Sequence, residues 1–208
     1  MKKKYLILIT VFIVIFLAML GVCLFDKNLL FDKAIYNFII SFRSDSLDSV
    51  FKFITCFGNP ITIVCLVIAF ILIFRNKDSL FLTMSALDSV ILNTILKYIV
   101  RRDRPSHLRL ISESGYSFPS GHAMISVCVY GFLFYLAYSK IKNKYLRFIS
   151  CLCLGILILG IGISRIYVGV HYPSDIIAGY SLAIIIIILL VQLEKIIKIE
   201  DGRICIKW

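Results

Sequence analysis

The chain has 208 residues, of which 60% are hydrophobic, and its 23 Lys and Arg residues outnumber 12 Asp and Glu residues to give a formal net charge of +11. A soluble domain is roughly 45–50% apolar. The higher apolar content of this chain, together with its mean hydropathy of +0.95, excludes an ordinary soluble domain and indicates a polytopic membrane protein. Nucleic acid is excluded as a partner, because a basic patch needs a solvated face that most of this chain lacks.

The apolar runs predict six membrane spans. The first run, from Tyr5 to Phe25, follows the basic sequence MKKK, carries no charge and is longer than the core of a secretory signal, so we expect an uncleaved span. A bilayer core takes about 20 apolar residues as helix. On this criterion the predicted spans are 5–25, 54–74, 79–98, 120–139, 146–164 and 176–193. Without an internal repeat or linker, residues 1–208 are expected to form one all-α membrane-embedded domain.

An amphipathic segment separates the first two spans. Its sequence, NLLFDKAIYNFIISF, places an apolar set at helical spacing against a polar set: Leu30, Ala34, Phe38 and Phe42 against Asp32, Lys33, Asn37 and Arg43. This pattern predicts a helix lying at the membrane surface. An ordinary amphipathic helix packed on the bundle would have the same pattern.

The Lys and Arg residues of the short loops predict the orientation. With both termini in the cytoplasm, slightly more than half of the 23 basic residues lie on the cytoplasmic side. The excess of basic residues on the cytoplasmic side is small, because the outer hairpins also carry Lys and Arg residues. These hairpins connect spans three and four and spans five and six. Both hairpins open on the same side of the membrane, so we expect their polar residues to converge at an extracytoplasmic site.

The seven cysteines fall mostly inside apolar runs, which predicts small buried side chains. A disulfide framework is not indicated. Cys151 and Cys153 are spaced C-x-C with no partner cluster, a pattern that does not favour zinc.

The first polar cluster is KYIVRRDRP, in which Lys97 ends the third span and Arg104 and Pro105 follow. Cations at a helix end are ordinarily anchors that extend to the lipid headgroups. This cluster indicates a binding site only in combination with the two that follow.

The second cluster is FPSGHA, at the start of the fourth span. Pro119 suits a helix start, where its missing N–H has no intrahelical partner. Free backbone N–H groups at a helix N-terminus favour phosphate, Ser120 can donate a hydroxyl hydrogen bond, and Gly121 allows close approach. His122 can transfer a proton near neutral pH. A simple helix cap would have the same residues.

The third cluster is SRIYVGVHYPSD, in which Arg165 ends the fifth span and His171 precedes Asp175 by four residues. A carboxylate at this spacing can accept from imidazole Nδ1 and leave Nε2 free as nucleophile or base. A structural pair at a helix start is the alternative. A charge at mid-bilayer costs about 2.5 to 3.5 kcal/mol or more, and one anion site explains why all three clusters lie at the same membrane edge.

Together the clusters resemble the three-part signature of the type 2 phosphatidic acid phosphatase superfamily. The matching residues are Lys97-x6-Arg104-Pro105, Pro119-Ser120-Gly121-His122 and Ser164-Arg165-x5-His171-x3-Asp175, with no departure from the pattern. The resemblance implies metal-independent removal of phosphate from a lipid phosphate or diphosphate through a phosphohistidine, without a cofactor. It further implies that His171 attacks phosphorus, Asp175 orients it and His122 protonates the leaving oxygen. Lys97, Arg104, Ser120, Gly121 and Arg165 are then expected to hold the phosphoryl oxygens.

The substrate is left open by the sequence. Undecaprenyl diphosphate is the favoured substrate because an outward-facing site matches where it is released, and phosphatidylglycerophosphate or phosphatidic acid are the alternatives. A non-catalytic lipid-phosphate binder or transporter, or a phosphatase of soluble phosphate esters, are the other functions considered. Oligomeric state, tail length and whether the loop at 99–118 acts as a lid are not predicted.

Several polar residues lie outside the signature. For Asp88 and Asn93, inside the third span, we expect packing roles. His107 and Arg109 are expected on a solvated loop face, Arg101 and Arg102 among lipid headgroups, and Tyr167 and Tyr172 at the membrane interface.

Overall fold

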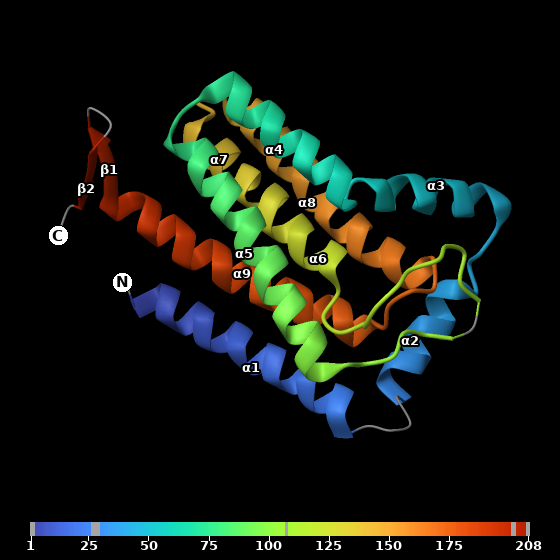
Figure 1. Cartoon of the computed structure of the whole chain (residues 1–208). Helices are drawn as coiled ribbons and strands as arrows, with labels where there is room; N and C mark the ends of the chain where they lie inside the picture. The colour runs from blue at the N-terminus through green and yellow to red at the C-terminus, as the bar shows by residue number, and fades with distance from the viewer. Residues whose placement is uncertain (1–2, 26–29, 107, 201–202, 207–208) are drawn as a thin grey trace.

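The computed structural model describes residues 3–25, 30–106, 108–200 and 203–206. Apart from a short C-terminal hairpin, the regular structure is helical (Figure 1). The elements in chain order are α1 (Lys3–Phe25), α2 (Leu30–Ile40), α3 (Asp45–Cys56), α4 (Pro60–Phe74), α5 (Lys77–Val100), α6 (Gly121–Ser126), the π-helical turn η1 (Val127–Gly131), α7 (Phe132–Lys140), α8 (Lys144–Tyr167), α9 (Pro173–Ile196), β1 (Ile197–Glu200) and β2 (Arg203–Ile206). The antiparallel pair β1–β2 was not predicted.

The long helices run up and down in one bundle, with α1 lying along α9 at its edge (Figure 1). Within the described residues, five helical segments are long and apolar enough to cross a membrane: α1, α5, α6 through α7, α8 and α9. The pair α3–α4 makes a sixth if it is taken as one span. This is the multi-pass all-α fold that the hydropathy predicts, and five of the six spans agree with the prediction to within three residues.

The second span, predicted as one helix over 54–74, is instead broken. The axes of α3 and α4 differ by 47° across the break at 57–59. Pro60 starts α4, where its missing N–H does no harm, and the Asn59 side chain caps the new helix by accepting from the Ile61 N–H at 3.0 Å. The Tyr130 hydroxyl fixes the break by donating to the Phe57 carbonyl at 2.7 Å. Most of the predicted span therefore forms α4, whereas its first three residues, 54–56, are the end of α3, which lies across the end of the bundle.

The amphipathic segment forms α2, but its faces are oriented unexpectedly. Leu30, Phe38 and Phe42 are exposed, as a helix at a membrane surface requires and a helix packed on the bundle through its apolar face does not. Asp32, assigned to the polar face, is completely buried. The helix therefore packs on the protein through Asp32 together with Tyr36, Ile39 and Ile40, and its predicted apolar face points outward.

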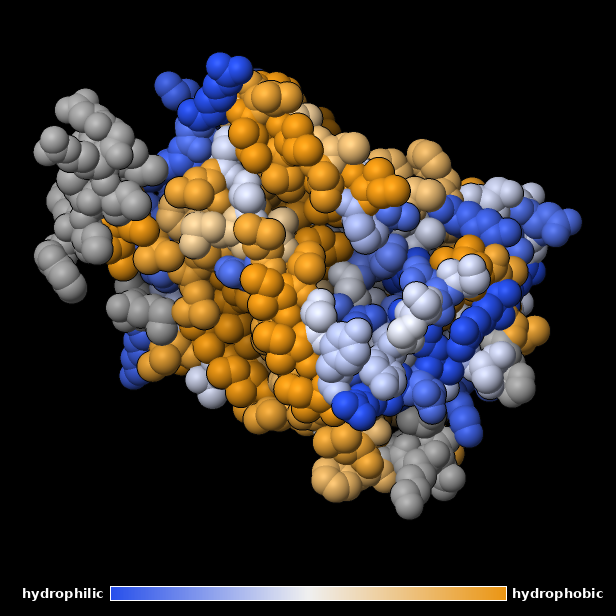
Figure 2. Space-filling view, in the orientation of Figure 1, coloured by the Kyte–Doolittle hydropathy of each residue, from blue (hydrophilic) through white to orange (hydrophobic). Residues whose placement is uncertain are grey.

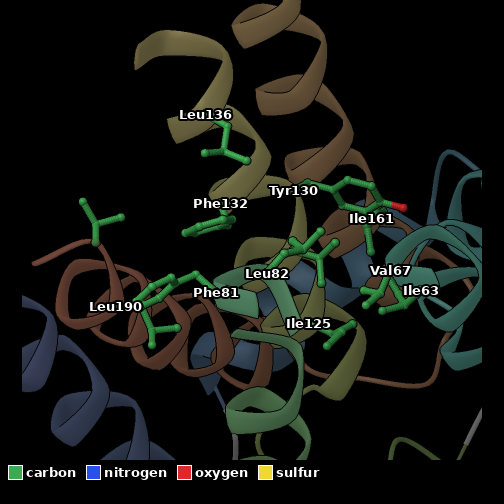
Figure 3. Close-up of a cluster of buried hydrophobic side chains, with 12 residues drawn as sticks. Ile63, Val67, Phe81, Leu82, Ile125, Tyr130, Phe132, Leu136, Ile161 and Leu190 are labelled. Carbon is green, nitrogen blue, oxygen red and sulfur yellow. The ribbon is translucent and has the colours of Figure 1, made fainter. Parts of the chain in front are cut away.

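The main hydrophobic core lies between α4, α5, α8, α9 and the α6–α7 helix. Figure 3 shows Phe81, Leu82, Tyr130, Phe132 and Ile161 meeting there. The π-helical turn interrupts the α6–α7 helix at this level, and Ser85 of α5 donates to the carbonyl of its Cys128 at 2.8 Å. The helix that begins at the proposed site is thereby fixed to its neighbours.

The outer surface is strongly divided. Figure 2 shows apolar side chains along the flank formed by α4 and α5, and hydrophilic side chains gathered over α3 and the loop at 101–120. Six cysteines with described side chains are free, and Cys128 is buried as expected, whereas Cys56 on α3, Cys65 on α4 and Cys153 on α8 are exposed. For these three the expectation of burial inside the protein was wrong, because a lipid-facing position is equally apolar. The side chain of Cys205 lies outside the described residues.

Candidate active site

The three polar clusters converge at one end of the bundle. The loop at 101–120 follows α5, Ser120 is the N-cap of α6, and His171 lies in the turn between α8 and α9. A cavity of about 660 Å³ opens there, and its polar wall is formed by Lys97, Arg104, Gly121, His122 and His171 together with Glu113, Ser114 and Asn93. The other three predicted site residues, Ser120, Arg165 and Asp175, are buried around this wall.

His171 is held in one tautomer by its neighbours. Its Nε2 lies 3.0 Å from an Arg104 guanidinium nitrogen, and a guanidinium can only donate, so Nε2 accepts. The proton therefore lies on Nδ1, which is 3.4 Å from Asp175 Oδ2 and 3.2 Å from Ser117 Oγ. The predicted His–Asp pair is present, with a serine added to it.

Ser117 was missed by the sequence reasoning. It is buried, and its hydroxyl donates to Asp175 Oδ2 at 2.5 Å while lying within reach of the imidazole. The Tyr172 backbone N–H also donates to this carboxylate oxygen, at 2.9 Å. The only signal was its position three residues before Ser120, in the same polar stretch.

The basic residues of the site have different partners, and Arg104 and Arg165 are buried whereas Lys97 is half-buried. Lys97 donates to the Tyr116 carbonyl at 2.7 Å, and Arg104 to the Val170 carbonyl at 3.1 Å. Arg165 donates to Thr55 at 2.6 Å and forms an ion pair with Glu113. Its Nε has no hydrogen-bond partner among the described residues. Glu113 also lies 3.9 Å from Arg104, so its carboxylate is the anion between the two arginines.

His122 enters the cavity from the first turn of α6. Ser120 caps this helix by accepting from the Ala123 N–H at 3.5 Å. Pro119 follows a cis peptide bond from Phe118 and precedes the cap, so it lies outside the helix in which it was expected. Asn93 has the expected packing role, because its amide donates to the Pro119 carbonyl at 3.0 Å. Gly58 allows the α3–α4 break to lie against the imidazole, since a Cβ there would approach His122 to 2.9 Å.

Burial sets the charge of the loop histidine. Desolvation lowers the pKa of His171 to about 3, although the hydrogen bond to Asp175 opposes the shift. Desolvation also lowers the pKa of Arg104, which stays charged because the guanidinium pKa is intrinsically very high. At neutral pH the site therefore presents an uncharged imidazole, with a lone pair on Nε2, beside a cation.

Two further predictions for this end of the bundle, for Arg102 and Tyr167, were wrong. Arg102 is buried and forms ion pairs with Asp32 and Asp175, so it does not lie among lipid headgroups. Tyr167 is buried, stacked on Phe51 with ring centroids 4.1 Å apart. Tyr172 is half-buried beneath the Arg102 guanidinium, which lies 4.3 Å from its ring centroid.

The other polar residues outside the signature lie in different environments. Arg101 and Arg109 are exposed, as expected for loop cations. Asp88 is half-buried beside a small apolar cavity between α5 and α9. His107 lies outside the described residues. Across the described ranges, no group of three or more His, Cys, Asp or Glu side chains could hold a metal ion.

The fold and site define an integral membrane protein that gathers histidines and basic side chains around a cavity at one end of a helical bundle. The family model of the PAP2 superfamily matches residues 78–197, more than half of the chain. The chain therefore belongs to the PAP2 superfamily, and it is a membrane lipid phosphatase.

Its relatives cover most of the chain. Phosphatidylglycerophosphatase B of Bacillus subtilis is 31% identical over 175 residues, which are 80% of this chain and 85% of the relative. Undecaprenyl-diphosphatase of Sulfolobus acidocaldarius is 30% identical over 213 residues, 96% of this chain and 97% of the relative. The crystal structure of a transmembrane PAP2 type phosphatidylglycerolphosphate phosphatase from Bacillus subtilis has a TM-score of 0.82 at 26% identity, covering 94% of this chain and 98% of that one.

Proposed function

We propose that this phosphatase hydrolyses a lipid phosphate or diphosphate through a phosphohistidine on His171, without a metal ion, and that undecaprenyl diphosphate is its physiological substrate. The observation that carries the proposal is the position of Nε2, which meets the Arg104 guanidinium at the wall of a cavity whose other side is apolar. A phosphoryl group that enters there binds the Arg104 guanidinium in place of His171. The lone pair of Nε2 is then free to attack phosphorus.

The reaction has two steps. In the first, the lone pair of His171 Nε2 forms the N–P bond, the bond from phosphorus to the leaving oxygen breaks, and His122 gives that oxygen its proton. In the second, water attacks phosphorus, His122 takes back a proton, the N–P bond breaks and inorganic phosphate leaves. Asp175 supports the imidazolium character that Nδ1 acquires while phosphorus is bound.

The cations take the role that a metal has in many phosphotransferases. Charge spreads over three equatorial oxygens in the transition state, so donors already in place lower the barrier. Lys97, Arg104 and Arg165 supply three positive charges, and Ser120 and the Gly121 amide lie at the start of α6. The partnerless Nε of the buried Arg165 suits an incoming phosphoryl oxygen. For Arg165 to bind it fully, the phosphate must displace Glu113.

The apolar part of the cavity fits a lipid tail. Below the histidines it is lined by α4 and α5 side chains, among them Val64, Ile68 and Val90, which are exposed on the apolar flank of the bundle. A tail can remain in the bilayer along this groove while its phosphate reaches the cations.

Replacing Ile68 with Trp should raise KM for a long-tailed substrate several-fold and leave turnover of a short-tailed one unchanged. Ile73→Trp is the matched control, because Ile73 is also exposed on α4 but lies outside the cavity wall. Detergent-solubilised enzyme and substrates with the same headgroup would make this measurement. Equal effects of the two tryptophans would contradict the proposed tail groove.

The choice of substrate and of membrane side has separate support. The two relatives above are named for undecaprenyl diphosphate and for phosphatidylglycerophosphate, at nearly equal identity. The loop charges favour cytoplasmic termini and so an extracytoplasmic site, on the side where undecaprenyl diphosphate is released. The orientation supports the diphosphate as the substrate.

Phosphate release in the presence of excess chelator tests the proposal. Purified enzyme would receive undecaprenyl diphosphate, phosphatidylglycerophosphate, phosphatidic acid and a tailless phosphate ester in parallel. We expect chelator-resistant release with the highest kcat/KM for undecaprenyl diphosphate. Preference for a tailless ester would support an enzyme of soluble phosphates, and binding of lipid phosphate without release would support the binder or transporter.

A further inference from the structure

A buried chain of charges connects α2 to the catalytic carboxylate. One Arg102 guanidinium nitrogen lies 2.5 Å from Asp175 Oδ1, and another lies 2.5 Å from Asp32 Oδ2. Asp32 and Asp175 have no exposed surface, and Arg102 is almost completely buried. The two carboxylates are 143 positions apart in the sequence (175 − 32), so only the tertiary fold brings them to one guanidinium.

Asp32 also holds the start of α9. Its Oδ1 accepts from the Ser174 backbone N–H at 2.8 Å, and its Oδ2 accepts from the Ser174 hydroxyl at 2.6 Å. Arg102 donates to the same hydroxyl at 2.7 Å. The residue before Asp175 is thus fixed through both its backbone and its side chain by groups of α2 and of the loop after α5.

The two oxygens of Asp175 have separate partners. Oδ1 accepts from Arg102, whereas Oδ2 accepts from Ser117 and from the Tyr172 N–H and faces His171 Nδ1. Arg102 thereby sets the rotation of the carboxylate about its χ2 torsion. Without it, Oδ1 would be a buried charged oxygen lacking its cation, a costly state that turning the carboxylate would relieve.

We propose, on the basis of the proposed phosphohistidine mechanism, that Asp32 and Arg102 are positioning residues for the reaction. Asp32 aligns Arg102, and Arg102 holds Asp175 so that Oδ2 remains directed at His171. Neither residue lines the cavity wall, so neither contacts the substrate. The surface helix α2 is in this way part of the catalytic apparatus, through a carboxylate directed away from the membrane surface.

The test is a double-mutant cycle in which kcat is measured with undecaprenyl diphosphate, the proposed substrate. Asp32→Asn and Arg102→Lys each remove one directional partner while keeping size or charge, so we expect kcat to fall about tenfold or more with KM unchanged. Combined with Asp175→Asn, neither change should lower kcat further, because both act through that carboxylate. Arg101→Gln and Asp45→Asn are the controls, since both residues are exposed and outside the cavity wall, and both should retain the kcat of the unmodified enzyme.

The possible outcomes separate the two levels of the proposal. If Asp175→Asn alone leaves kcat unchanged, the proposed mechanism fails. If Asp175→Asn lowers kcat and Asp32→Asn lowers it again by the same factor in the double variant, the positioning role fails and Asp32 only supports the fold. Thermal unfolding in detergent checks that each variant is folded, and Arg102→Lys provides the test if Asp32→Asn is not.

Discussion

Replacing His171 with Ala should abolish phosphate release, with kcat lower by about 10⁴-fold or more, because the variant has no nucleophile to form the covalent intermediate. Lipid binding should persist, since Lys97, Arg104 and Arg165 remain. Acid-labile radioactive phosphate on the protein, trapped from a labelled lipid phosphate, would be present in the unmodified enzyme and absent from the variant. The neutral state of this imidazole at pH 7, which follows from its lowered pKa, means that no proton needs to leave before attack.

The control for His171→Ala is Ser117→Ala, which changes a neighbour of the same imidazole. Ser117 is bonded to Asp175 and lies near Nδ1, so its loss should reduce kcat but leave the phosphoenzyme detectable. Residual turnover of His171→Ala close to that of Ser117→Ala would contradict the nucleophile assignment. It would favour direct attack of water in a site that the two histidines only shape.

Convergence of the three polar clusters could be predicted because it depends only on the number of spans between them. A hairpin after the third span and one after the fifth open on the same side of a membrane, whatever the packing of the helices. The spacing of His171 and Asp175 is equally local, since four residues across a helix start place them side by side. These features follow from chain connectivity, and the structure has both.

The burial of Asp32 and Arg102 behind Asp175 could not be predicted, because it depends on packing between elements that are distant in the sequence. Asp32 lies on the polar face of an amphipathic pattern, and such a residue is ordinarily solvated. The pattern contains no information on which face meets the protein when the apolar face meets lipid. Arg102 has the same ambiguity, since a cation after a membrane span ordinarily lies among lipid headgroups. Both become buried only because α2 crosses the start of α9.

The break between α3 and α4 has a local signal in the sequence, yet it was not predicted. The sequence FGNP contains a glycine, a capping asparagine and a proline in succession, which together are a local signal for a helix end and a new start. Apolar length outweighed that signal in the prediction of a single span. The break matters for the site because Thr55 reaches Arg165 from α3 and Gly58 lies against His122.

His122→Ala should slow the formation of the phosphoenzyme far more with phosphate monoesters than with diphosphates. The leaving oxygen of a monoester is an alkoxide, which needs a proton as its bond breaks, so kcat for phosphatidic acid should fall about 10²- to 10⁴-fold. The leaving group of undecaprenyl diphosphate is a phosphate, which is stable as an anion, so the first step should slow much less. Because His122 also removes the proton from the attacking water, phosphoenzyme should accumulate with the diphosphate, and a burst followed by slow release would report it.

Lys97→Ala is the matched control for this leaving-group effect. Lys97 lines the same cavity as His122 but acts on the phosphoryl oxygens, which both substrate classes share. Its loss should lower turnover of monoester and diphosphate by similar factors and give no burst. Equal losses in the rate of phosphoenzyme formation from both substrates in His122→Ala would contradict a proton-donor role and assign this imidazole to phosphate binding. The ratio of the two losses therefore distinguishes the general acid from a further oxyanion contact, with no assumption about the natural lipid.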